Sequence, residues 1–152
     1  MEAVHVTETR LADRIPSHVF RFVEQELYDY PVNRELVLDY LRRRNEILHK
    51  GRQMPELDVM PDGGELEDPT FHAALRLLAI ERPAQRAMEY VAAIDSVMRT
   101  LTDEQRKFIK RKYWDKDCTD EALAMELGMS RATLYRMQKT VIRAFALRFG
   151  LL

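Results

Sequence analysis

Apolar residues recur at helical spacing along most of this chain. From Ile15 onward they are separated by steps of three and four residues, the period of one buried helix face. Pro31 interrupts the first run, and Asn33 is placed to cap a second helix. The pattern predicts a helical hairpin over residues 15–50, preceded by a loose arm at residues 1–14. The first run consists of Phe20, Val23, Leu27 and Tyr30.

The longest periodic stretch follows a linker. Residues 51–68 are rich in glycine, proline and acidic side chains, a composition typical of a loop. Asp68 and Pro69 form a helix start, an N-capping acid followed by proline at the first helical position. The segment 69–101 then predicts one long helix, which Pro83 must either kink or divide in two. Its heptad positions are Ala73, Leu77, Ile80, Ala84, Ala87, Val91, Ile94, Met98 and Leu101.

Two interpretations of this heptad seam remain open. The seam can pack against the rest of its own chain, or it can form a dimer interface with a second copy. Three of its nine residues are alanine, which favours packing within the chain.

Residues 102–152 predict three helices with capping residues at each start. Thr102 and Gln105 have the spacing of a capping box. Thr119 can cap a short helix, and Ser130 can cap a long helix that runs to about Phe149. No segment of the chain alternates between apolar and polar residues as a strand does, so the predicted fold is all-α.

The last two of these helices match the helix-turn-helix pattern. Ala124 occupies the position where the helices cross most closely, and Gly128 occupies the tight turn, where a positive φ would require glycine. The other diagnostic positions are all apolar: Leu123, Leu127, Met129, Leu134 and Met137. We therefore expect a helix-turn-helix DNA-binding domain over residues 102–152.

Charge is distributed unevenly although the net charge is only −1. Residues 1–101 carry 13 basic and 18 acidic residues, whereas residues 102–152 carry 11 basic and 7 acidic ones. No acid occurs after residue 126, against five basic residues. A basic block of this kind favours a polyanionic partner at the C-terminal end, although a solvated helix face is the plain alternative. The acidic balance of the first 101 residues makes direct DNA contact there less expected.

The pattern also indicates which side chains can face DNA. The N-terminal part of a recognition helix enters the major groove, where arginine can bond a guanine edge and threonine or alanine can contact a thymine methyl. Serine, tyrosine and lysine can hold phosphates. The candidate DNA-binding residues are Thr119, Ser130, Arg131, Ala132, Thr133, Tyr135, Arg136, Lys139 and Arg143.

Little in the sequence supports an enzyme, a metalloprotein or a membrane protein. The four histidines are scattered without metal-ligand spacing, and Cys118 is the single cysteine, so we expect no metal, no cofactor and no enzyme activity. Tyr113 and Trp114 are expected to pack inside the domain rather than to stack on bases. No apolar run approaches the length of a membrane span. A cytoplasmic protein without membrane contact is expected.

Seven segments of the chain together carry a resemblance to a known family: 15–16, 24–30, 68–70, 101–104, 111–114, 119–124 and 127–130. Through them, residues 15–150 resemble a family of small phage-encoded transcriptional regulators, the RinA/ArpU type. The C-terminal half of these regulators is similar to region 4 of sigma factors. The resemblance implies a promoter-binding regulator of a phage operon that acts with host RNA polymerase.

The predicted function is a transcriptional regulator that binds double-stranded DNA sequence-specifically. Of the two kinds of regulator, we expect an activator. The N-terminal helices would assemble homodimers or larger homo-oligomers, or contact RNA polymerase. Two alternatives stay open: a DNA-recognition subunit for phage packaging, similar to the small terminase, and a sigma-like module that binds polymerase rather than DNA.

Overall fold

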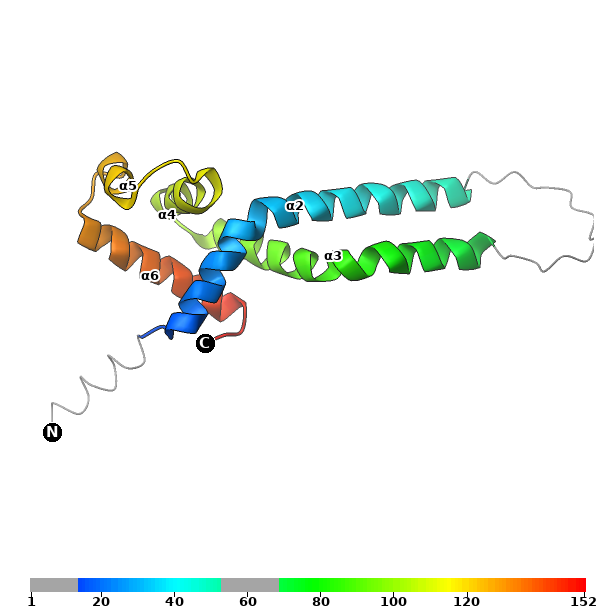
Figure 1. The fold of residues 1–152 in the computed structure, drawn as a ribbon, viewed down its shortest axis with the longest axis horizontal. Helices are drawn as coiled ribbons and strands as arrows, with labels where there is room; N and C mark the ends of the chain where they lie inside the picture. Colours follow the sequence, from blue (N-terminus) through cyan, green and yellow to red (C-terminus); the bar gives the residue numbers. More distant parts are fainter. Residues whose placement is uncertain (1–13, 53–68) are drawn as a thin grey trace, which may run out of the picture. The chain divides into compact units, whose positions relative to one another are not determined.

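The computed structural model describes residues 14–52 and 69–152, and every element in these two ranges is helical. The predicted all-α fold is confirmed. Most of the predicted arm and linker lie outside the described residues, as does the predicted cap Asp68. No described helix combines the length and apolar character needed to cross a membrane. The elements are α2 (Ser17–Arg52), α3 (Pro69–Thr100), α4 (Asp103–Ile109), the π-helix η1 (Lys110–Asp115), α5 (Asp120–Glu126) and α6 (Arg131–Arg148). Figure 1 labels the α-helices among them.

The predicted hairpin over residues 15–50 is wrong, because α2 runs through this segment without a break. Pro31 lies inside α2, and Asn33 therefore caps no second helix. Proline removes the hydrogen bond to the carbonyl of Leu27 and its ring crowds that carbonyl, but the φ of proline is itself helical, so the helix can continue through Pro31. The buried face before Pro31 holds the helix in place against that loss. It consists of Val19, Val23, Leu27 and Tyr30.

Helix α3 is also continuous, so Pro83 does not divide it. It starts at Pro69, as the sequence predicts. The heptad seam is buried by the chain itself from Ala84 onward, at Ala87, Val91, Ile94 and Leu101. The seam thus packs within its own chain rather than lying open for a partner. The three seam residues before Pro83 are half-buried.

The chain forms two compact units, whose boundaries lie within α2 and α3. One unit contains residues 14–30 and 92–152, and the other contains residues 31–91. The first unit holds most of the core, and its largest fully buried side chains include Tyr113, Phe108 and Phe145. Residues 14–30 and 92–101 therefore belong to the same folded body as the predicted helix-turn-helix segment.

Helix α4 begins with the predicted capping box. The Thr102 hydroxyl accepts from the backbone N–H of Gln105 at 3.2 Å, and the Gln105 side chain accepts from the backbone N–H of Thr102 at 3.0 Å. The helix then widens into η1, an unpredicted π-turn. It ends at Lys116, whose φ of 57° is left-handed.

Helices α5 and α6 are in contact and are joined by a tight turn. Thr119 and Ser130 cap the two helices as predicted, each accepting a backbone N–H three residues on. Gly128 has a φ of 66° and closes α5. Its N–H bonds to the carbonyl of Met125 and the following N–H bonds to that of Ala124, which is a Schellman motif.

Substitution of Gly128 tests the requirement for positive φ in this turn. A Cβ at Gly128 would meet no atom within 4 Å, so strain rather than a clash sets the cost. We expect Gly128→Ala to destabilise the protein by about 1–2 kcal/mol in urea denaturation. Gly128→Asn should cost clearly less, because asparagine tolerates the left-handed region. Equal stability of both variants and wild type would contradict this interpretation.

Candidate nucleic-acid interface

The outer face of α6 carries most of the predicted DNA-binding residues, and nearly all of them are exposed. Arg143 is half-buried and makes contacts of its own, so it is less available than expected. The exposed set begins at the start of α6 and extends over its first two turns, with Thr119 exposed at the start of α5. It comprises Thr119, Ser130, Arg131, Ala132, Thr133, Tyr135, Arg136 and Lys139.

The opposite face of α6 is the one that holds the helix in place. Leu123 and Ala124 of α5 and Leu134 of α6 are almost fully buried. Leu127, Met129 and Met137 are half-buried. The positions that the pattern marks as internal are thus turned inward or partly covered. The basic residues are left on the outside of α6 as a consequence.

Local contacts organise the start of α6. The hydroxyls of Ser130 and Thr133 are 2.9 Å apart, and the Arg131 guanidinium pairs with Glu121 at 3.0 Å. Both members of this ion pair are largely exposed, so the pair contributes little stability. Arg131 can therefore exchange Glu121 for another acceptor. One turn later, the Lys139 ammonium lies 4.5 Å from the centre of the Tyr135 ring.

A buried polar network attaches α6 and η1 to α2. The Tyr113 hydroxyl donates to the Glu24 carboxylate at 2.9 Å. The Gln138 amide donates both to Glu24, at 2.9 Å, and to the Tyr113 oxygen, at 3.0 Å. Burial, together with the adjacent Glu24 charge, raises the pKa of Tyr113 far above its ordinary value. Tyr113 therefore remains a hydrogen-bond donor at all physiological pH values.

Aromatic side chains extend this attachment along α2. The ring of Tyr28 meets Tyr113 edge-on at a centroid distance of 4.9 Å, and Tyr30 stacks on Trp114 at 4.6 Å. The Tyr30 hydroxyl also donates to Asp95 at 2.5 Å. Tyr113 and Trp114 pack inside the domain, as expected, and are not placed to stack on bases.

Basic residues in η1 and at the end of α4 fasten α5. The Arg111 guanidinium reaches Asp117 at 2.9 Å and Glu126 at 3.1 Å, and Lys107 also pairs with Glu126 at 3.2 Å. Hydrogen bonding to Asp117 and Glu126 raises the pKa of Arg111, while hydrogen bonds from Lys107 and Arg111 lower the pKa of Glu126. Lys107 and Arg111 therefore stabilise the fold, whereas Arg136 and Lys139 of α6 are exposed and pair with no acid that the described contacts show.

Sequence reasoning missed two groups of residues at this site. Glu24 and Gln138 were not singled out, although a glutamine between the apolar positions of α6 is a signal of a buried polar contact. Arg14 and Arg21 were discounted because of the acidic balance of the first 101 residues. Both are exposed and line the same cleft as Tyr135 and Lys139.

Two further features that bear on chemistry are a possible metal site and the single cysteine. Residues 14–52 and 69–152 contain no group of three histidine, cysteine or acidic side chains that could hold a metal ion. The thiol of Cys118 is half-buried and lies 3.9 Å from the carbonyl oxygen of Arg111.

Comparison with known proteins adds no relative. No protein-family model matches the chain, and neither a curated protein nor a solved structure matches it.

Removal of the Tyr113 hydroxyl tests the buried network. Tyr113→Phe removes one donor from the half-buried Glu24 and one acceptor from the buried Gln138, and we expect a loss of about 1–3 kcal/mol in the free energy of unfolding. Tyr135→Phe removes an exposed hydroxyl from α6 and should change stability by less than about 0.5 kcal/mol. Chemical denaturation of the two variants measures the difference. Equal stabilities would contradict a structural role of the network.

Proposed function

We propose that this protein is a sequence-specific DNA-binding transcriptional regulator. The single observation that carries the proposal is the outer face of α6. It is basic and acid-free, starts at a capped helix end, and is exposed because the apolar positions of α5 and α6 are turned inward. Such a face has the residue types that read base edges and hold phosphates.

In the proposed mechanism, α5, the Gly128 turn and α6 act as a helix-turn-helix. The first turns of α6 enter the major groove, where Arg131 and Arg136 bond base edges. Ala132 and Thr133 are small enough for a close approach and offer methyl groups to thymine. Ser130, Tyr135, Lys139 and Thr119 hold the backbone on either side. No step of this mechanism requires a cofactor or an enzymatic reaction.

The more specific role rests on the resemblance to RinA/ArpU-type regulators. We propose a phage-encoded activator of a late operon that works in the bacterial cytoplasm with host RNA polymerase. The support from the fold is the order of α4, α5 and α6, since the sigma region 4-like module that the resemblance implies consists of consecutive helices. A packaging subunit and a polymerase-binding module are the alternative outcomes of the experiment below.

The decisive experiment titrates the full chain on random duplex DNA and on the DNA around its own gene, at two salt concentrations. Much tighter binding to one fragment that survives the higher salt would support a regulator. Equal and salt-sensitive binding would shift the assignment toward packaging. Absence of DNA binding with capture of polymerase would overturn the proposal in favour of a polymerase-binding module.

Single substitutions on α6 separate base contacts from phosphate contacts. Arg136→Ala should cost roughly 1–3 kcal/mol on the preferred fragment and much less on random DNA, if Arg136 reads a guanine. Lys139→Ala should weaken both complexes alike and reduce their salt dependence. Arg148→Ala, at the far end of the same helix, is the matched control. Unchanged affinity of both test variants would contradict the assigned face.

We further propose that residues 31–91 bind the same residues of a second copy of the chain. Among the described residues of this unit, four apolar side chains are buried: Tyr40, Ala84, Ala87 and Val91. Several large apolar residues are meanwhile exposed, and three of them on each helix form a stripe, because their spacing places them on a common face. Two copies could bury these stripes as a four-helix assembly. The stripes are Leu38, Leu41 and Leu48 on α2, and Phe71, Leu75 and Leu78 on α3.

A charge placed in the α3 stripe tests this assembly. We expect Leu75→Glu combined with Leu78→Glu to lower the molar mass in sedimentation equilibrium to that of one chain, 17.9 kDa. Arg76→Glu introduces an acid on the same helix outside the stripe and should leave the mass unchanged. A wild-type protein that is already monomeric at micromolar concentration would contradict the assembly.

A further inference from the structure

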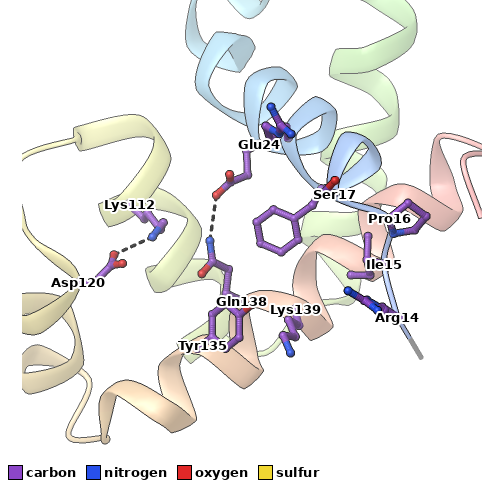
Figure 2. A pocket seen from close by; sticks show the side chains of 12 residues that line it. Arg14, Ile15, Pro16, Ser17, Glu24, Lys112, Asp120, Tyr135, Gln138 and Lys139 are labelled. Carbon is purple, nitrogen blue, oxygen red and sulfur yellow. Dashed lines mark hydrogen bonds and ion pairs between the residues drawn. The ribbon is translucent and has the colours of Figure 1, made fainter. Parts of the chain in front are cut away.

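A cleft of about 920 Å³ adjoins the proposed DNA-reading face of α6. It lies within the unit formed by residues 14–30 and 92–152, and its walls come from segments far apart in the sequence. Figure 2 shows residues 14–17 and the first turns of α2 on one side, and Lys112 with Asp120 on the other. Tyr135, Gln138 and Lys139 of α6 line it between them.

The charges of this cleft are not all available to a ligand. It is lined by four basic and two acidic residues, a net charge of +2. Lys112 neutralises Asp120 at 2.7 Å, and Glu24 is engaged by Tyr113 and Gln138. The remaining cations are Arg14, Arg21 and Lys139, all exposed to solvent.

The location of the two acids decides which kind of anion fits. Glu24 is held by two buried side chains, so its carboxylate lies at the inner wall of the cleft. A small anion that filled the cleft would meet this carboxylate and that of Asp120. A strand of nucleic acid that passes over the exposed edge would meet Arg14, Arg21 and Lys139 instead. The arrangement therefore favours an extended phosphate backbone over a compact anionic ligand.

The cleft is also adjacent to the residues assigned to DNA. Tyr135 and Lys139 belong to both surfaces. A second hollow of about 290 Å³ shares Asp120, Tyr135 and Gln138 with the cleft and reaches Arg131 and Ala132. A duplex that engaged Arg131 would therefore extend toward the start of α2.

We propose that Arg14 and Arg21, together with Lys139, bind the phosphate backbone of the DNA whose bases α6 reads. This inference rests on the proposed function and adds a second contact region to it, contributed by the N-terminal segment. The contact is independent of base sequence, because only phosphates are reached. It also explains how a chain with an acidic N-terminal half can hold DNA there, since two of its arginines line the same cleft as Tyr135 and Lys139 of α6.

The test compares the double variant Arg14→Ala/Arg21→Ala with wild type in the full chain. Fluorescence anisotropy on the preferred fragment and on random duplex gives affinities over a range of salt concentrations. We expect weaker binding to both DNAs by the same factor, and a slope of log K against log salt that is smaller by about one to two. Arg42→Ala/Arg43→Ala removes two exposed cations of α2 in the other unit, and is the matched control.

The outcomes separate this inference from the proposed function. If the double variant binds like wild type while Arg136→Ala still weakens binding, the phosphate contact is wrong and the regulator stands. If the double variant loses affinity only for the preferred fragment, the two arginines read bases, and this result would also overturn the proposed phosphate contact. If the wild type binds no DNA, both proposals fail. Saturable binding of inorganic phosphate that the double variant loses, with DNA affinity unchanged, would assign the cleft to a small anion.

Discussion

The hydrogen-bonded group of Glu24, Tyr113 and Gln138 is the constraint on which the candidate interface depends. Its members come from α2, η1 and α6, and each is hydrogen-bonded to the other two. Tyr113 and Gln138 are buried, and a buried polar group without its hydrogen-bond partner is costly, so the three elements can come together in few ways that satisfy this group. Because Gln138 lies on the inner side of α6, this requirement turns the opposite, basic side outward.

Two groups of basic residues in the unit formed by residues 14–30 and 92–152 have different roles. Lys107, Arg111 and Lys112 pair with acids of α5 and the loop before it, and so hold the short helix against η1. Arg136 and Lys139 lie on the open face of α6. Net charge alone does not distinguish these sets. The distinction explains why a nearly neutral protein can present a strongly basic surface at one place.

The local elements of residues 102–152 could be predicted because their signals are local. A capping residue accepts a hydrogen bond from an N–H three residues away, and a positive φ at a glycine concerns only its own backbone. The roles of Thr119, Ser130 and Gly128 can therefore be predicted from the neighbouring sequence. The hairpin at residues 15–50 was mispredicted for a related reason. A proline weakens a helix locally, but whether the helix continues depends on the burial of its flanking turns. That burial cannot be predicted from the residues next to the proline.

The sequence by itself determined the all-α class, the starts of α3, α4, α5 and α6, and the division of α5 and α6 into inner and outer faces, since helical periodicity records which side is buried. Tertiary structure alone decided that residues 14–30 fold with residues 92–152, that Glu24 meets Gln138, and that Arg14 and Arg21 line a cleft beside α6. The hydrogen bonds among them join residues from 65 to 114 positions apart. They follow from packing and polar pairing in three dimensions, which leave no periodic trace along the chain.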